Sequence, residues 1–314
     1  MLTISPISFP GLGLRMDPPG GFSLGSLTIN IYGLCIAVGL LLAVWYGCKR
    51  ANKFGFEQED ILDGVLIVVP IAILCARLYY CIFRWDLYKA EPLSILKIWE
   101  GGLAIYGGII GAAAGVSVFC LIKKIKLPAL LDLVALGFLI GQSVGRWGNF
   151  FNREAYGAET ESFLRMGLFL TPERTYSYSE RFYHPTFLYE SLWNAAGFVL
   201  LHFLSKRRKY DGQIALGYAA WYGLGRTFIE GLRTDSLYIP GSQTLRVSQL
   251  LAAITCFCAV LMLVIMSFRK HEAEKLYVNQ IAAKAALEAE EEAEKGAEES
   301  EEAVSVESEE KAEE

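Results

Sequence analysis

The stretch GQSVGRWGNFFNREAYG, residues 141–157, changes character within a few positions. It begins as the end of an apolar run, and residues 146–154 then bring together two arginines, two asparagines, one glutamate and three aromatic residues. Polar groups at this density are costly near lipid, and they are usually retained there because they have a function. A helix end that reaches water carries the same residue types, so the stretch alone leaves both interpretations open.

The composition is that of a membrane protein. The chain has 314 residues, 53% of them hydrophobic, and a mean hydropathy of +0.33, which favours several membrane spans over a soluble domain. The formal net charge of −5 hides a segregation: residues 272–314 contain 16 acidic and 4 basic residues, a net of −12, whereas the rest carries +7. We expect a basic membrane-embedded body with an acidic tail and no nucleic-acid partner.

Seven apolar runs are long enough, or nearly long enough, to cross a membrane as helices. The runs cover residues 27–48, 61–83, 103–122, 130–145, 186–204, 214–230 and 247–268, of which the fourth and sixth are short. We therefore predict an all-α polytopic membrane protein with seven transmembrane helices. Within the third run, Gly107, Gly111 and Gly115 recur at intervals of four, which indicates a face where a neighbouring helix packs closely.

Basic residues alternate between the loops and so predict the orientation. Clusters at 49–53, 123–126, 206–209 and 269–270 follow the first, third, fifth and seventh runs. Because basic loops face the cytoplasm, we expect the N-terminus outside and the C-terminus inside. The polar stretch then lies at the outer end of the fourth helix.

The segments outside the helical body have compositions of their own. Residues 1–26 are rich in Pro and Gly and are predicted to be an irregular arm at the outer membrane surface. Residues 146–185 are too long for a plain connector and are predicted to form a small outer cap. The body spans residues 27–268, and the acidic tail, residues 269–314, is expected to be cytoplasmic and disordered towards its end.

Seven cysteines lie within or beside apolar runs, where thiols act as small hydrophobic groups. The three histidines have no zinc-ligand spacing with them. We expect neither a metal nor a cofactor, and a monomer.

Ionisable residues inside the apolar runs are the candidate functional groups. Tyr222, Arg226 and Glu230 are four apart and share one helix face, so Arg226 either pairs with Glu230 or binds an anion with Glu230 as its support. Glu190 is expected to be an arginine partner rather than a free acid. Asp63 and Asp132, nearer the cytoplasmic side, are expected to be structural.

The outer ends of five predicted helices place polar residues at a common depth. These residues are Tyr32, Tyr106, Arg146, Asn149, Glu154, Glu190, Tyr222, Arg226 and Glu230, with Arg77 offered by the second helix. Two or three arginines at one site suit a phosphate, which in an outer leaflet belongs to a phospholipid headgroup. The pattern fits an enzyme or a phospholipid transporter or flippase. Tyr32 and Tyr106 would also suit interfacial anchors.

The motif GRWGNFFNREAYG resembles the signature G-R-x-G-N-F-x-N-x-E-x-x-G of the prolipoprotein diacylglyceryl transferases at every fixed position. The segments IYGL, GGLAIYGG and HPTFLYE and the Tyr222–Arg226–Glu230 stripe also resemble landmarks of that family, in the same order. The resemblance covers about residues 27–268.

The resemblance implies a seven-helix enzyme of the bacterial inner plasma membrane with its active site towards the outer face. Such an enzyme transfers the diacylglyceryl group of phosphatidylglycerol to the lipobox cysteine thiol of a preprolipoprotein and releases glycerol phosphate. With this resemblance, the predicted catalytic residues are Arg146, Arg226, Tyr106 and Glu154. The predicted substrate-binding residues are Arg146, Asn149, Gly157, Tyr32, Tyr222, Glu230, Glu190 and Arg77.

Tyr106 departs from the family pattern, because many members place a histidine, a candidate general base, at this position. A tyrosine with a pKa of about 10 is a poor base at neutral pH. Either nearby arginines lower the pKa of Tyr106, or the base is elsewhere. In the second case the substrate thiol would lose its proton in the positive field of Arg146 and Arg226.

Overall fold

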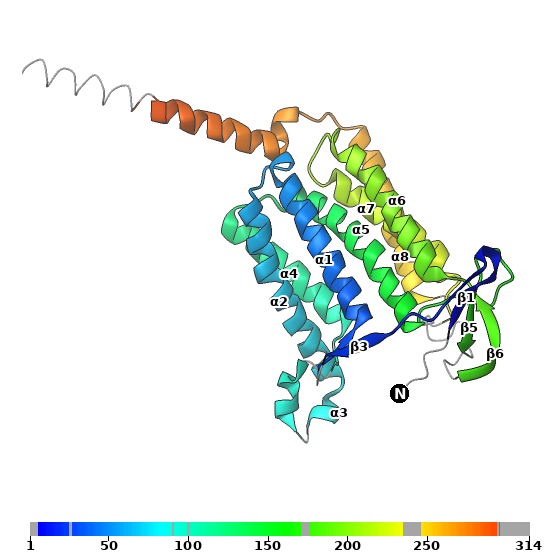
Figure 1. Cartoon of the computed structure of the whole chain (residues 1–314). Coiled ribbons are helices and arrows are strands. Elements are labelled where there is room, and N and C mark those ends of the chain that lie inside the picture. The colour runs from blue at the N-terminus through cyan, green and yellow to red at the C-terminus, as the bar shows by residue number, and fades with distance from the viewer. Residues whose placement is uncertain are drawn as a thin grey trace, which may run out of the picture.

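The computed structural model describes residues 6–24, 27–89, 91–98, 101–170, 176–234, 246–293 and 295. Within these ranges the fold is mostly helical, and its long helices run side by side as a bundle (Figure 1). The helices of 18 residues or more are α1 (Ile31–Arg50), α2 (Gln58–Phe83), α4 (Ile105–Lys123), α5 (Leu127–Asn152), α6 (Thr186–Ser205), α7 (Gln213–Glu230) and α8 (Val247–Ser267). The short helix α3 (Trp85–Tyr88) lies in the α2–α4 connection.

Six of these helices, α1, α2, α4, α5, α6 and α8, are long and apolar enough to cross a membrane. Their outward faces carry exposed large apolar side chains such as Leu66, Leu121 and Ile122, which are 72%, 79% and 75% exposed. Exposed apolar surface on this scale suits contact with lipid. The predicted all-α polytopic membrane protein is therefore correct only in part: the described residues are mostly helical with six candidate spans, they also contain β-strands, and a crossing by the more polar α7 stays a prediction.

Two predicted helix bounds were wrong. The first helix begins at Ile31 rather than at residue 27, because β4 (Leu27–Asn30) pairs with β3 (Gly21–Leu24). The fourth was predicted to end at residue 145, but α5 continues through the polar stretch to Asn152. It can do so because Arg146 and Asn149 find partners within the fold, as described below.

The α2–α4 interface confirms the predicted glycine face. A Cβ atom on Gly107 would lie 2.4 Å from both the Cys75 carbonyl oxygen and Tyr79 Cβ, and one on Gly111 would lie 2.5 Å from Cys75 Cβ. At their other ends the two helices are joined by an ion pair of 2.7 Å between Lys123 and Asp63. The structural role expected for Asp63 is therefore confirmed.

The α1–α5 interface is also built on glycines. A Cβ on Gly39 would lie 3.1 Å from the Gly141 carbonyl oxygen, and one on Gly148 would lie 2.7 Å from the ring of Tyr32. Close helix approach at these positions places the Tyr32 ring directly against the polar stretch of α5.

The buried carboxylate of Asp132 joins α5 to α7. It is 0% exposed and accepts hydrogen bonds from the backbone N–H groups of Gly212, Ile214 and Ala215 at 2.8–2.9 Å. These donors belong to the first turn of α7, where a negative charge also complements the helix dipole. The structural role expected for Asp132 is confirmed.

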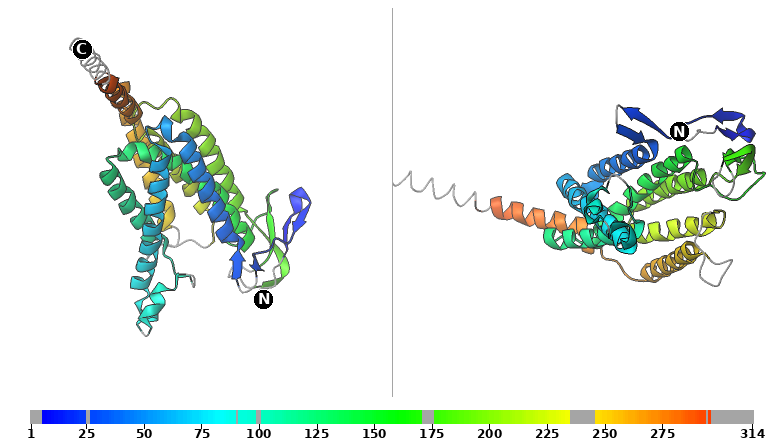
Figure 2. Two further views of the ribbon diagram at one scale, coloured as in Figure 1. Left: turned by 60° about the vertical axis from the view of Figure 1, so that its left-hand side comes forward. Right: turned by 90° about the horizontal axis from the view of Figure 1, so that it is seen from below.

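The basic loops meet at one end of the bundle, called here the basic end. Arg50 donates to Ser205 Oγ at 3.4 Å, Arg208 donates to the Lys53 carbonyl at 2.9 Å, and Lys126 pairs with Asp211 at 2.8 Å. A helix over residues 277–293 leaves from this end, opposite the N-terminal strands (Figure 2). The last part of the predicted tail, residues 296–314, lies outside the described residues.

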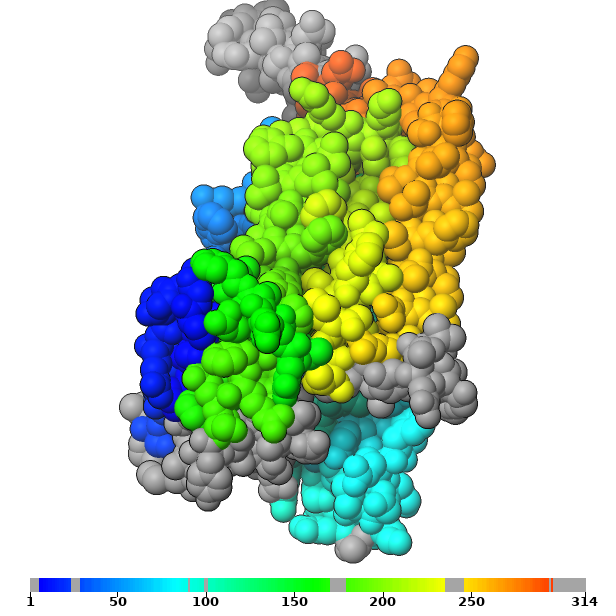
Figure 3. Space-filling view, turned by 90° about the vertical axis from the view of Figure 1, so that its right-hand side faces the viewer, coloured from blue at the N-terminus to red at the C-terminus, as the bar shows by residue number. Residues whose placement is uncertain are grey.

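The N-terminal arm, predicted to be irregular, instead contains strands. Strands β2 (Leu14–Met16), β1 (Ile7–Phe9), β5 (Met166–Leu170) and β6 (Tyr176–Tyr183) form an antiparallel sheet in that order. The arm and the segment after α5 therefore share one sheet, and their residues lie side by side in Figure 3. The end of the bundle that carries this sheet is called here the site end.

We predict opposite effects of adding a methyl group at two neighbouring glycines of α4. Gly107→Ala forces a Cβ to within 2.4 Å of α2, and such overpacking should destabilise the protein by about 1–3 kcal/mol. Gly108→Ala places its Cβ at 3.7 Å from Ala76 Cβ and should stabilise it by about 0.5–1 kcal/mol, because alanine is favoured in a helix. Thermal midpoints in detergent measure both effects, and equal shifts would contradict the packing described.

Candidate functional site

The chain turns sharply where α5 ends. Arg153 follows the helix in a left-handed conformation with φ of 52°, and Ala155 has φ of 55°. Arg153 fixes this turn to the N-terminal arm, since its Nη2 lies 3.0 Å from an Asp17 carboxylate oxygen and 2.9 Å from the Pro18 carbonyl. Burial lowers the pKa of Arg153, yet the guanidinium remains charged. The turn points Glu154 back towards α5, where it accepts a hydrogen bond of 3.0 Å from Asn149.

Glu190 is the centre of the polar cluster. Its side chain is 5% exposed, and its Oε2 atom lies 2.5 Å from Arg146 Nη2. Its Oε1 atom lies 3.0 Å from Arg226 Nη1 and 3.7 Å from Arg233 Nη1. One carboxylate of α6 therefore joins α5, α7 and the segment after α7. The expectation that Glu190 is an arginine partner is confirmed, with more partners than expected.

A second carboxylate holds the other side of Arg226. Arg226 Nη2 lies 2.6 Å from Glu230 Oε2, and Ser248 donates a hydrogen bond of 2.5 Å to Glu230 Oε1. The Arg246 guanidinium donates to the Glu230 carbonyl oxygen. The i,i+4 pair is thus present, and Arg226 also belongs to the wider cluster. Four arginines, Arg146, Arg226, Arg233 and Arg246, thus gather around two buried glutamates.

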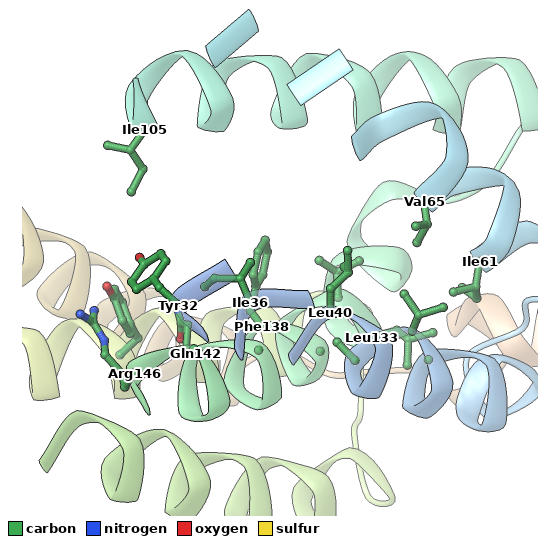
Figure 4. A pocket seen from close by; sticks show the side chains of 18 of the residues that line it. Tyr32, Ile36, Leu40, Ile61, Val65, Ile105, Leu133, Phe138, Gln142 and Arg146 are labelled. Carbon is green, nitrogen blue, oxygen red and sulfur yellow. The ribbon is translucent and has the colours of Figure 1, made fainter. Parts of the chain in front are cut away.

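A cavity of about 610 Å³ begins beside Arg146 and runs along α1 and α5. Its polar end is formed by Tyr32, Arg146, Asn149 and Tyr222. Its walls are mostly apolar and extend to Gly47, Ile61 and Leu133 near the basic end, with Ile105 of α4 across the space from Tyr32 (Figure 4). From Leu133 to Asn149 the wall spans about 24 Å of helix. A long apolar space with one cationic end is suited to an amphiphile that carries an anionic group.

Gly157 acts by permitting close packing. Its N–H donates to the His184 carbonyl at 2.9 Å, and a Cβ here would lie 2.7 Å from His184 Cβ and 2.9 Å from the Leu232 carbonyl. It also forms a β-bridge with Arg233. Gly157 therefore brings Arg233 to the cluster, although it was predicted to bind substrate directly. Burial lowers the pKa of His184, so its imidazole is neutral at pH 7.

Two predicted site residues are placed differently from the cluster. Tyr106 is 54% exposed, and its neighbour Ile105 lines the cavity instead. Arg77 is 5% exposed and donates to the carbonyl oxygens of the α2–α4 connection, at distances from 2.6 to 3.3 Å. These carbonyls belong to Ser94, Ile95, Lys97, Gly101 and Gly102. Such contacts favour a role for Arg77 in holding that connection over direct substrate binding.

The sequence reasoning left three members of the cluster out of the predicted site. Arg233 follows Glu230 by three residues, and this spacing was a usable signal. Arg246 immediately precedes α8, and Ser248 lies in the first turn of that helix. Nothing in their local sequence indicates that they contact Glu230. Within the described ranges, no group of three or more His, Cys, Asp or Glu side chains is arranged to hold a metal.

We predict that Glu190→Gln lowers the thermal midpoint markedly. The change removes the charge that separates three guanidinium groups, and it should cost about 1–3 kcal/mol, because Arg146 and Arg226 keep 22% and 17% of their side-chain surface exposed. Glu159→Gln is the matched control: its 2.8 Å pair with Arg181 is exposed on both sides and should contribute about 0.5 kcal/mol or less. Equal midpoints for the two variants would contradict the central place of Glu190.

Comparison with known proteins gives a consistent result. A family model described as prolipoprotein diacylglyceryl transferase matches residues 19–265. A Bacillus velezensis protein is 41% identical over 263 residues, which cover 83% of this chain and 96% of that protein. A Streptococcus suis protein is 45% identical over 255 residues, covering 80% and 93%, and one from Listeria monocytogenes serotype 4a is 44% identical over 230 residues, covering 72% and 83%. Each of these relatives is named phosphatidylglycerol–prolipoprotein diacylglyceryl transferase.

Proposed function

The chain belongs to the prolipoprotein diacylglyceryl transferase family, and on this premise we propose that it catalyses the transfer from which the family takes its name. The enzyme transfers the diacylglyceryl group of phosphatidylglycerol to the lipobox cysteine thiol of preprolipoproteins. A thioether forms, and glycerol phosphate is released. This reaction is a step of lipoprotein biosynthesis in bacteria.

The observation that carries the proposal is the position of Arg146 at the polar end of the long apolar cavity. The phosphate of phosphatidylglycerol lies at Arg146, whose guanidinium matches phosphate oxygens, and an acyl chain extends between α1 and α5. Tyr32, Asn149 and Tyr222 surround the headgroup. The second arginine, Arg226, is held next to Arg146 because both guanidinium groups contact the carboxylate of Glu190.

The chemistry is a displacement at the glycerol carbon that carries the phosphate ester. The cysteine sulfur forms a bond to this carbon as the carbon–oxygen bond breaks, and the oxygen leaves with the glycerol phosphate. The departing phosphate gains negative charge, which the guanidinium groups of Arg146 and Arg226 stabilise. The same field favours loss of the thiol proton to water, because a thiol with a pKa of about 8.5 is acidified by nearby cations.

The surrounding residues hold this arrangement in place. Glu190 and Glu230 fix the two sides of the Arg226 guanidinium, and Glu154 fixes Asn149 at 3.0 Å. These shared contacts reduce the freedom that the arginines would otherwise lose on binding. Glu154, the acidic residue of the motif GRWGNFFNREAYG, contacts Asn149 at the headgroup site and serves there as a catalytic or orienting group.

We further propose that α7 crosses the membrane as the seventh helix. Its 18 residues span about 27 Å, close to the hydrocarbon thickness, and it packs between α6 and α8. The basic end then faces the cytoplasm, and the arginine cluster and the sheet face the outer side of the plasma membrane. Arg226 and Glu230 lie in the last part of α7, near the outer boundary.

Arg146→Ala should lower turnover by about 100- to 1000-fold, because a charge that stabilises the leaving phosphate is lost. The measurement is release of glycerol phosphate from phosphatidylglycerol vesicles with a lipobox peptide and purified enzyme. Arg269→Ala, an exposed arginine at the basic end, is the matched control and should retain full turnover. Retained turnover in Arg146→Ala would overturn the assigned site.

Tyr106→Phe should keep at least half of the wild-type turnover. The Tyr106 side chain is half exposed and does not line the cavity, so its hydroxyl is not placed to accept the thiol proton. The pH dependence of turnover in the variant should match that of the wild type. A loss of 100-fold or more, with normal folding, would instead make Tyr106 the general base.

A further inference from the structure

Two reciprocal contacts connect α6 to its neighbours just below the arginine cluster. In each contact two residues face each other, and the side chain of each donates a hydrogen bond to the backbone carbonyl of the other. Trp193 and Trp221 form the first pair, called here the tryptophan clasp, and Ser143 and Ser191 form the second, called here the serine clasp. We propose that the two clasps position the arginines by fixing the register of α5, α6 and α7.

The tryptophan clasp joins α6 to α7. Trp193 Nε1 donates to the Trp221 carbonyl at 3.0 Å, and Trp221 Nε1 donates to the Trp193 carbonyl at 2.9 Å. The two rings are stacked, with centroids 4.4 Å apart and an interplanar angle of 19°. Each indole N–H can therefore reach the opposite carbonyl in only one helix register, and a slide of one helix along the other breaks both hydrogen bonds.

Glycines on both helices make room for the indoles. A Cβ on Gly197 would lie 2.4 Å from Trp221 Nε1, and one on Gly225 would lie 2.2 Å from Trp193 Nε1. Each helix thus carries a tryptophan followed four residues later by a glycine. Because the same spacing occurs on two antiparallel helices, the two halves of the contact match each other in one register.

The serine clasp joins α5 to α6 in the same manner. Ser143 Oγ donates to the Ser191 carbonyl at 2.9 Å, and Ser191 Oγ donates to the Ser143 carbonyl at 2.8 Å. Ser191 is 5% exposed, so this contact is shielded from water. Interhelical hydrogen bonds of serine are an established way of joining membrane helices.

Both clasps lie within about one and a half turns of the ion pairs. Ser191 and Trp193 follow Glu190 by one and three residues on α6. Ser143 precedes Arg146 by three residues on α5, and Trp221 precedes Arg226 by five on α7. All four residues lie on the basic side of the cluster. A shift of one residue between two helices moves the charged groups by about 1.5 Å, enough to break an ion pair of 2.5–3.0 Å.

The activity part of the test rests on the proposed function and uses changes that remove the hydrogen-bond donors. Trp193→Phe and Trp221→Phe keep an aromatic ring, and Ser143→Ala with Ser191→Ala removes only hydroxyl groups. We expect kcat for glycerol phosphate release to fall about 10- to 100-fold, with the KM for phosphatidylglycerol changed less than about twofold. In a Glu190→Gln background, Trp193→Phe should lower kcat by less than about twofold more, because the pair that it positions is already lost.

Two matched controls separate positioning from general damage. Trp45→Phe changes an exposed tryptophan of α1, and Ser117→Ala removes a hydroxyl that donates to its own helix at 2.8 Å. Both should keep kcat within about twofold of the wild type. Unchanged kcat in the clasp variants, or equal losses of kcat with and without Glu190→Gln, would overturn the inference.

Thermal midpoints provide a readout that does not depend on the reaction. The shift for the double variant Trp193→Phe with Glu190→Gln should be smaller than the sum of the single shifts, because both changes loosen the same contact between α6 and α7. Additive shifts would overturn the clasp inference. If the wild-type protein releases no glycerol phosphate, the proposed function is overturned. The thermal midpoints of the variants would then still test whether the clasps fix the helix register.

Discussion

The carboxylate of Glu190 is the constraint on which the site depends. Three guanidinium groups from α5, α7 and the segment after α7 lie within 2.5 to 3.7 Å of its two oxygens. Without this charge, arginines so close together would repel one another in surroundings that screen charge poorly. Glu190 therefore allows several arginines to lie close together, and one of them, Arg146, is placed at the polar end of the cavity, where a phosphate can bind. The helix register, the turn after α5 and the close packing at Gly157 all serve to bring the partners to this carboxylate.

Much of the fold follows from local properties of the sequence. Apolar runs identified the long helices, and the spacing of Gly107, Gly111 and Gly115 identified the α2–α4 interface, because helix faces repeat with a fixed period. The bounds of α5 were not predictable in the same way. Its last two turns contain Arg146 and Asn149, residues that from sequence alone indicate a helix end. In the structure Arg146 pairs with Glu190, which is distant in the sequence, and Asn149 donates to Glu154, which follows the turn after α5. Strand β1 of the N-terminal arm pairs with β5, which lies about 160 positions further along the chain.

The site was predictable to a similar extent. Arg226, Glu190 and Glu230 were identified from charge inside apolar runs and Arg146 from the polar stretch that follows one, and the structure brings the four together. Arg77 shows the limit of that reasoning, because a buried arginine can be satisfied by carbonyl oxygens of a loop whose path the sequence does not reveal. Arg246 and Ser248 contact Glu230 from positions 16 and 18 residues further along the chain, so their roles depend on tertiary structure.

The cavity and the cluster together account for a lipid substrate with an anionic headgroup, and the family assigns the reaction. The most direct test of this account is the mass of a lipobox peptide after incubation with the purified enzyme and vesicles that contain phosphatidylglycerol. The account predicts that the peptide gains the mass of one diacylglyceryl group on its cysteine, and that vesicles of phosphatidylethanolamine alone give no such product. A peptide of unchanged mass, with phosphatidylglycerol instead moved between the leaflets, would contradict the account and indicate a lipid carrier.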